Sequence, residues 1–230
     1  MQPETKQAAY QTSAYNVAGE AMMSFKPVNR IHQHLCAFHS YAHDQTRFVR
    51  ADHFCAQLSE DFDQCVIYDS NKKDARLIGV EYIVSEKIFK SLPPEEKRFW
   101  HSHKHEIESG LLQLFPKSFV PSVATDHAEK PAMTELQKTY GKTIHTWAYD
   151  KHPDLPLGPP TLMLSATSDA QGPPSDMVKK RDEESGQDTA AKKKARKEYL
   201  PSYETVEGSD ELQRSGRGVV FEVKEVEAKK

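Results

Sequence analysis

A chain of 230 residues with 10 Gly and 14 Pro is long enough for one sizeable hydrophobic core and too poor in these two residues for a wholly disordered protein. Its 31 Lys and Arg stand against 34 Asp and Glu, and the formal charge of −3 excludes a global attraction to nucleic acid or to an anionic membrane. The apolar runs are strand-sized, far from the roughly 18–20 residues that span a bilayer, so no transmembrane segment is predicted.

The cysteines and the N-terminal residues indicate the cellular compartment in which the protein is expected. The three cysteines, Cys36, Cys55 and Cys65, are an odd number and form no CxxC pair. We therefore expect buried, unpaired thiols and a reducing compartment rather than a disulfide framework. The first 25 residues lack a basic segment followed by an apolar one, and Gln2 stands where N-myristoylation needs glycine. These features predict a cytoplasmic protein without a lipid anchor.

Residue types divide the chain into three parts. All 11 histidines and both tryptophans lie between His32 and His152, whereas residues 169–230 contain no Cys, His or Trp. The predicted parts are a flexible N-terminal arm over 1–25, one domain over 26–168, and a charged C-terminal extension over 169–230. Within the arm, a short helical turn is expected near Val17–Met23.

The first element of the domain is predicted to be a helix over residues 31–43. At 100° per residue, His32, Cys36, His39 and His43 fall within an arc of about 60°, beside a stripe of apolar residues. One side of this helix would face a core and the other a polar site.

The segment that follows contains the expected strands. Residues 46–58 are assigned to a strand, with helical continuation as the alternative. Residues 64–68 and 76–84 are rich in Val, Ile and Tyr, and the stretch 70–74 between them has turn-forming residues. These two segments are therefore predicted to form a β-hairpin.

Short helices and two further strands complete the expected fold. Ser85 is expected to cap one helix and Pro93-Pro94-Glu95-Glu96 to open the next. Residues 132–140 are predicted to be helical, with Gly141 as the stop signal. Two more strands are predicted, over residues 143–149 and 161–166. The pattern indicates an α+β fold: a single compact domain with a mostly antiparallel sheet, short helices, and flexible N- and C-terminal extensions.

Two groups of histidines suggest a metal site. His39 and His43 have the i, i+4 spacing of ligands on a helix, and His101 and His103 would share one face of a strand, together with His105. The primary candidate ligands are His39, His43, His101 and His103, and the secondary candidates are His34, His53 and Asp44. Four nitrogens suit a divalent metal such as zinc.

Other interpretations of these residues stay open. The histidines could instead be hydrogen-bonded core or surface residues. Asp44 and Asp52 would either orient imidazoles or cap a turn. Cys36 lies one helical turn from two histidines, yet a lone cysteine among apolar residues is more typical of an inert core position than of a nucleophile. The sequence contains neither GxxxxGK[ST] nor GxGxxG, so ATP and dinucleotide chemistry are not supported, and no catalytic residue is named.

Two basic clusters in the C-terminal extension have the spacing of a bipartite nuclear import signal. Their residues are Lys179, Lys180, Arg181, Lys192, Lys193, Lys194, Arg196 and Lys197. Residues 169–230 hold 13 basic against 14 acidic side chains. The alternative is therefore a solvated, charged surface.

Three blocks of sequence carry a resemblance to a known family. They are HLCAFHSYAHDQTR, CVIYDSNKKDARLIGVEYIVSEKIFKSLPPEEKRFWHSH and LPLGPPTLMLS, and over about residues 31–165 the chain resembles the oil body-associated protein family. The biochemical function of this family is unknown, and its best-known plant members are linked to seed lipid droplets. The histidines that match its pattern are His34, His39, His43, His53, His101 and His103; His105 does not.

Two classes of function follow. The resemblance implies a non-enzymatic protein associated peripherally with the lipid droplet surface or with a droplet protein, and nucleic acid is not an expected partner. The histidines alternatively indicate a metal-binding protein or a metal-dependent enzyme. Oligomeric state is not indicated by the sequence.

Overall fold

The computed structural model describes residues 10, 12–117 and 122–228, and the chain divides into two units, residues 1–31 and 32–230. In the first unit, the described residues form helix α2 (Ser13–Met22) and the 3-10 helix η1 (Val28–Arg30). The hydroxyl of Thr12 accepts a hydrogen bond from the backbone N–H of Tyr15 and so caps α2. A helix was expected here, and α2 begins four residues earlier than the predicted turn.

The second unit is built on an antiparallel sheet that closes into a ring. Its long strands are β1 (Gln33–Tyr41), β2 (Asp44–Ser59), β3 (Phe62–Tyr68), β4 (Leu77–Ser85), β7 (Thr139–His145) and β8 (Thr161–Leu164). They pair in this order, and β1 pairs with both β2 and β8, which closes the ring. The two-residue strands β5 (His101–Ser102) and β6 (Gln113–Leu114) pair with β7 and β1. The predicted α+β fold with a mostly antiparallel sheet is confirmed.

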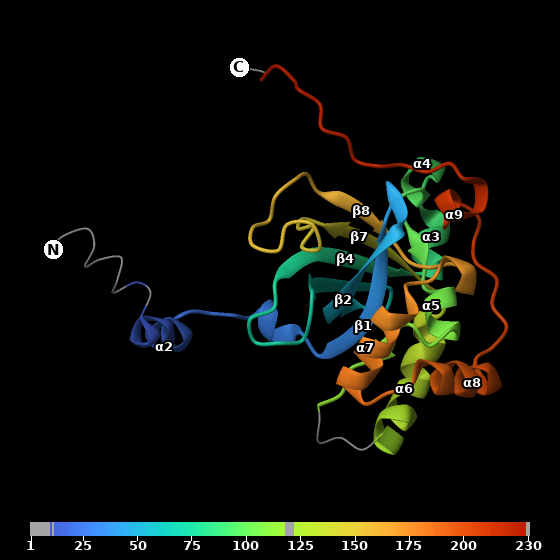
Figure 1. Ribbon diagram of the computed structural model, residues 1–230, viewed down its shortest axis with the longest axis horizontal. Coiled ribbons are helices and arrows are strands. Elements are labelled where there is room, and N and C mark those ends of the chain that lie inside the picture. Colours follow the sequence, from blue (N-terminus) through green and yellow to red (C-terminus); the bar gives the residue numbers. More distant parts are fainter. Residues whose placement is uncertain (1–9, 11, 118–121, 229–230) are drawn as a thin grey trace. The chain divides into compact units, whose positions relative to one another are not determined.

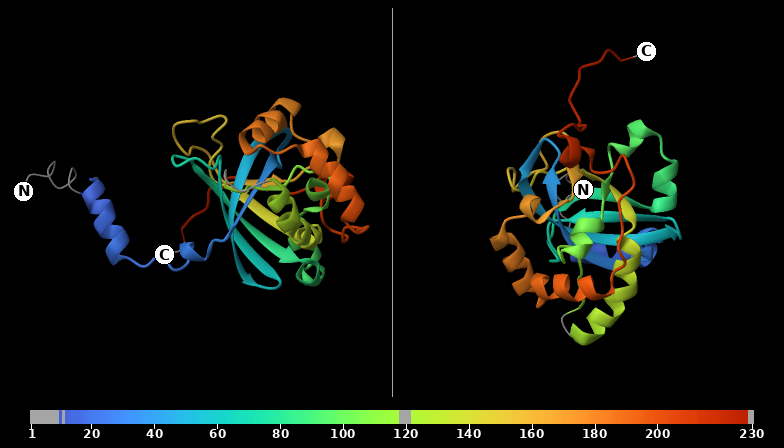
Figure 2. Two further views of the ribbon diagram at one scale, coloured as in Figure 1. Left: turned by 90° about the horizontal axis from the view of Figure 1, so that it is seen from below. Right: turned by 90° about the vertical axis from the view of Figure 1, so that its right-hand side faces the viewer.

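Helices gather on one side of this sheet, and the loop between β7 and β8 extends on the opposite side (Figures 1 and 2). The helices are α3 (Glu86–Ser91), α4 (Pro94–Lys97), α5 (Lys104–Glu108), α6 (Ser122–Leu136), η2 (Asp169–Gln171), α7 (Ser175–Ser185), α8 (Thr189–Tyr199) and α9 (Glu211–Ser215). The predicted cap at Ser85 and the predicted helix opening at Pro94 are both confirmed.

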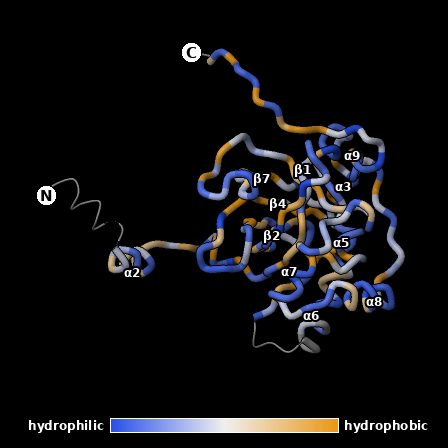
Figure 3. The backbone as a smooth tube through the Cα atoms, viewed as in Figure 1, coloured by the Kyte–Doolittle hydropathy of each residue, from blue (hydrophilic) through white to orange (hydrophobic). Residues whose placement is uncertain are grey.

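Side chains alternate along each strand, and one set points into the ring. His39 of β1 contacts His145 of β7, and His53 of β2 contacts Glu81 of β4, although another strand separates each pair. Only the inside of a closed sheet allows such contacts, so these residues define the inner face. Figure 3 shows hydrophobic stretches along the strands and hydrophilic residues in the turn between β3 and β4.

The predicted helix over 31–43 is wrong, because residues 33–41 form β1. This strand is buried on both faces: its inner face lies within the ring, and on its outer face Phe38 packs against Met177 and Val178 of α7. A strand covered on both sides lacks the alternation of apolar and polar residues that marks a half-exposed strand. Its apolar residues then also match a helical spacing.

Other element predictions are confirmed or corrected in detail. The strand over 46–58 and the hairpin of 64–68 with 76–84 are confirmed by β2, β3 and β4. Gly141 is not a helix stop, because α6 ends at Leu136 and Gly141 lies inside β7. The strand predicted for His101 to His105 ends at Ser102, and His103 is the N-cap of α5.

The expectation of three unpaired cysteines is wrong for two of them. Cys55 and Cys65 face each other across β2 and β3 with their Cα atoms 4.1 Å apart, and they form a disulfide. Cys36 is a buried free thiol. The cysteine count therefore gives no argument for a reducing compartment.

The C-terminal helices bury part of the proposed import signal. Arg181, Lys192 and Arg196 are 1%, 8% and 1% exposed. Arg181 donates hydrogen bonds to backbone carbonyl groups of the sheet region, 2.7 Å from the carbonyl oxygen of Leu111. An import receptor needs accessible basic side chains, so the structure does not support nuclear import of the folded chain.

Candidate metal centre

Five buried side chains with metal-binding atoms converge on the inner face of the ring. His39 comes from β1, His53 from β2, Glu81 from β4, His101 from β5, and His103 from the start of α5. Their exposed fractions lie between 0% and 3%. Burial of so many polar groups requires that they satisfy one another or bind an ion.

The donors form two overlapping groups of three. One contains His39, His53 and Glu81, and the other contains Glu81, His101 and His103; within each group the ligand atoms lie within 4.8 Å of one another. These are the two such groups found in the part of the chain that the structure describes. Glu81 belongs to both and is therefore the centre of the cluster.

The contacts of Glu81 are short but are not all hydrogen bonds. Its Oε2 lies 2.8 Å from Nε2 of His53, and its Oε1 lies 3.4 Å from Nε2 of His101 and 3.3 Å from Nε2 of His103. Among the described residues, no ring nitrogen of His53 or His101 has hydrogen-bond geometry to a partner. Buried nitrogens without a hydrogen-bond partner are free to serve as metal ligands.

Electrostatics inside the ring keep the carboxylate ionised. Burial would raise the pKa of Glu81, but His53, His101 and His103 outweigh it and hold this pKa well below its ordinary value. Burial would also lower the pKa of His53 and of His103. Glu81 outweighs it at His53, and Glu81 together with Glu106 outweighs it at His103, so each pKa is raised.

The imidazoles of His39 and His145 are neutral at neutral pH. Burial, followed by repulsion from His53, lowers the pKa of His39 well below its ordinary value and that of His145 to about 3. Neutral imidazole is the form that binds a metal ion. The cluster therefore offers both a carboxylate and unprotonated nitrogens.

Neighbouring groups orient the histidines. Nε2 of His145 lies 3.1 Å from Nδ1 of His39, and Nδ1 of His103 lies 2.7 Å from the hydroxyl oxygen of Thr139. Glu106 is also buried, and its Oε1 lies 3.8 Å from Nε2 of His103. Such contacts fix the ring orientation of metal-ligating histidines in known sites.

Gly141 keeps space open beside the donors. A Cβ atom added at this position would collide with Oε1 of Glu81 and would lie 2.8 Å from Nε2 of His103 and 2.9 Å from Nε2 of His101. Gly141 pairs directly with His101 and with Ile83 across the sheet. Any other residue at this position would fill the space on which the second group of donors converges.

The structure brings together three of the four primary candidates. His39, His101 and His103 meet in the cluster, and the secondary candidate His53 joins them. His43 is exposed in the turn between β1 and β2, because the helix on which its spacing was based is a strand.

The other secondary candidates lie outside the cluster. Asp44 accepts hydrogen bonds from Thr46 beside the same turn. Nε2 of His34 lies 2.8 Å from Oδ1 of Asp52, which also accepts from Arg50. Burial, followed by repulsion from Asp52, raises the pKa of the Cys36 thiol to about 11, which disfavours the thiolate that a nucleophile needs.

Sequence reasoning missed Glu81 and His145. Glu81 is the single acidic residue in the apolar stretch LIGVEYIV. Alternation places it on the same face as Gly79 and Ile83, so a buried charge in need of partners was readable from this strand. His145 ends β7 and gave no comparable signal.

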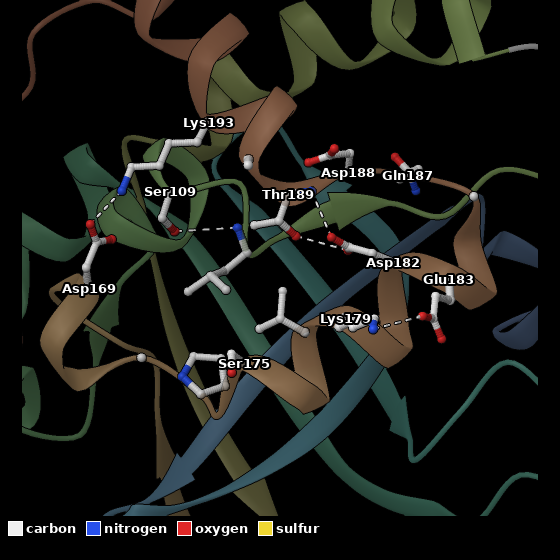
Figure 4. A pocket seen from close by; sticks show the side chains of 16 residues that line it. Ser109, Asp169, Ser175, Lys179, Asp182, Glu183, Gln187, Asp188, Thr189 and Lys193 are labelled. Carbon is white, nitrogen blue, oxygen red and sulfur yellow. Dashed lines mark hydrogen bonds and ion pairs between the residues drawn. The ribbon is translucent and has the colours of Figure 1, made fainter.

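A separate cavity of about 710 Å³ lies between α7 and α8 (Figure 4). Four of its charged lining residues form two pairs, Lys193 with Asp169 at 2.5 Å and Lys179 with Glu183 at 3.8 Å. None of the five metal-binding candidates lines it. Its chemistry does not indicate a ligand.

Comparison with known proteins identifies relatives. A family described as "Protein of unknown function (DUF1264)" matches residues 25–200. Oil body-associated protein 1B of Arabidopsis thaliana is 48% identical over 160 residues, 70% of this chain and 64% of that protein. Oil body-associated protein 2A of Zea mays is 44% identical over 210 residues, 90% of this chain and 81% of that protein.

The match to protein 1B thus spans a little less than two thirds of that relative's length. No solved structure matches the chain. Within the described residues, no helix combines the length and the apolar character that crossing a membrane requires.

Proposed function

Because this chain belongs to the oil body-associated (DUF1264) family, whose biochemical role is open, we propose that it is a metal-binding member of that family. The proposed ligands are His39, His53, Glu81, His101 and His103. Imidazole nitrogens with one carboxylate suit zinc, and also copper or nickel.

One observation carries this proposal: two buried histidines of the cluster have ring nitrogens without hydrogen-bond partners among the described residues. His53 and His101 are 3% and 0% exposed, and no ring nitrogen of either has a hydrogen-bond partner among the described residues. An unsatisfied buried polar group costs about 1–3 kcal/mol, and a bound ion would remove that cost for several nitrogens together.

A structural role fits this site better than catalysis. Structural zinc sites are closed by protein ligands, whereas catalytic sites keep one position open to water or substrate. All five donors are buried, so the cluster has the closed character of a structural site. The non-enzymatic assignment is part of this proposal.

Metal analysis of the purified full-length chain tests the proposal. We expect at least one equivalent of a transition metal, and a chelator should lower the melting temperature because metal affinity adds to the free energy of folding. His53→Ala should bind less metal than the unchanged chain. His43→Ala, which changes an exposed histidine of the turn, is the matched control and should keep it. Metal binding would be refuted if the chain bound none of zinc, copper and nickel and if the chelator left its melting temperature unchanged.

Peripheral association with lipid bodies is a second proposal, supported by the names of the relatives. The first unit offers a surface of suitable chemistry, because Val17, Met22 and Met23 are 65%, 78% and 59% exposed. Helices that present apolar side chains in this way bind lipid surfaces in proportion to the apolar area that they bury.

A further inference from the structure

We propose that the cluster holds two metal ions and that the carboxylate of Glu81 bridges them. This inference rests on the proposed function and adds its stoichiometry and the assignment of ligands to each ion. The first ion would be bound by His39, His53 and Oε2 of Glu81, and the second by His101, His103 and Oε1 of Glu81.

The two carboxylate oxygens face different histidines. Oε2 of Glu81 lies 2.8 Å from His53, and Oε1 lies 3.4 Å and 3.3 Å from His101 and His103. A carboxylate with one nitrogen donor at one oxygen and two at the other has the arrangement of a bridging ligand. In known two-metal sites the ions are about 3.5–4 Å apart, a separation that one carboxylate spans.

One ion cannot use all five donors. With metal–nitrogen bonds of about 2 Å, two donors on the same ion lie at most about 4 Å apart. The donors fall into two groups, in each of which the ligand atoms lie within 4.8 Å of one another, and the two groups share only Glu81. Two centres therefore account for the positions of all five side chains.

Each group has a further buried donor beside it. His145, with Nε2 at 3.1 Å from His39, adjoins the first group. Glu106, with Oε1 at 3.8 Å from His103, adjoins the second and adds a second negative charge to balance the ions. Both residues are at most 2% exposed, so neither is a surface group.

The test is a titration of the chelator-treated full-length chain with Zn²⁺ and with Co²⁺, with bound metal counted by mass spectrometry and by the cobalt absorption spectrum. We expect two equivalents for the unchanged chain and for His43→Ala. His53→Ala should keep one equivalent and His101→Ala should keep the other. Glu81→Gln should weaken both, because its amide cannot bridge two cations.

A substitution at a glycine tests the second centre without removing a ligand. Gly141→Ala fills the space beside His101, His103 and Oε1 of Glu81 and should lower the stoichiometry from two to one. Gly172→Ala is the matched control, since the nearest atom to its added Cβ is 3.4 Å away, and it should bind two. Circular dichroism confirms that each variant is folded before its metal is counted.

The outcomes separate this inference from the proposed function. One equivalent for the unchanged chain, lost in both His53→Ala and His101→Ala, would leave metal binding intact and overturn the two-ion centre. No bound metal at all would overturn both.

Discussion

Glu81 is a carboxylate inside the ring, and its close contacts are three imidazoles. A buried charge without compensation is costly, so the positions of His53, His101 and His103 account for its ionised state. Metal ions would supply the same compensation while leaving the imidazoles neutral. Glu81 is therefore central to the site both with and without bound metal ions.

Asp150, nearer the surface, is another carboxylate whose partners outweigh the effect of burial on its pKa. It accepts hydrogen bonds from the Tyr41 hydroxyl at 2.9 Å and from Nη2 of Arg47 at 2.7 Å. Burial would raise the pKa of Asp150, but these two partners outweigh it and the pKa is lowered. Because the pKa in the folded state lies below its unfolded value, the ionised carboxylate stabilises the fold at neutral pH.

We predict that Asp150→Asn lowers the free energy of unfolding by about 1 kcal/mol at pH 7, because Arg47 loses its charged partner at a partly exposed site. The wild-type advantage should be full above the unfolded pKa of about 4 and should shrink as the pH falls through the lower folded pKa. Urea unfolding between neutral and strongly acidic pH measures it. Asp154→Asn, in the exposed part of the same loop, should change little; an equal loss for both variants at every pH would contradict the prediction.

At the scale of elements, α8 is held to α5 and α6 by buried charges. Arg196 of α8 pairs with Glu129 of α6 and donates to the Ile107 carbonyl oxygen at 2.6 Å. Lys192, one turn earlier, pairs with the same carboxylate. The basic residues that resembled an import signal thus join helices to one another.

We predict that Arg196→Ala destabilises the chain by about 3 kcal/mol, because it removes a buried partner of Glu129 and leaves the Ile107 carbonyl without this donor. Lys197→Ala, on the exposed side of the same helix, should stay within about 0.5 kcal/mol of the wild type. The melting temperatures of both variants, measured by thermal unfolding, test this difference in stability. Similar melting temperatures would mean that α8 is not anchored through Arg196.

At the scale of the whole molecule, the predicted boundaries at residues 25 and 168 can be compared with the structure. The first unit ends at residue 31, six residues beyond the predicted arm. The boundary at residue 168 stays a prediction, but α7 and α8 lie beyond it and contribute Arg181 and Arg196 to the buried interior. The family match also continues past it, to residue 200.

We predict that the chain binds lipid bodies reversibly. Purified protein, added to triacylglycerol droplets coated with phospholipid, should float with them and should be removed by alkaline carbonate, as expected for shallow interfacial contact through exposed apolar side chains. A wash with high salt measures any electrostatic part of the binding. Replacing Met22 and Met23 with Ser should reduce the floated fraction. Protein that resists both washes would contradict a peripheral mode of association.

Local patterns in the sequence determined the elements that depend on neighbouring residues. The β3–β4 hairpin, the cap at Ser85 and the helix start at Pro94 were predicted because turn residues, capping side chains and proline act within a few positions. Three stretches of sequence were likewise enough to indicate the family. The clustering of histidines pointed to His39, His101 and His103 as members of the site.

Tertiary structure alone decided which residues meet. His39 and His145 are 106 positions apart and become neighbours only because β1 pairs with β8 and closes the ring. Closure buries the inner face of β1 and α7 covers its outer face, which together hid its strand character. His43 lies in the turn that follows this strand. Long-range strand pairing therefore assigned Glu81 and His145 to the site, since no periodicity within a single segment reports contacts across a closed sheet.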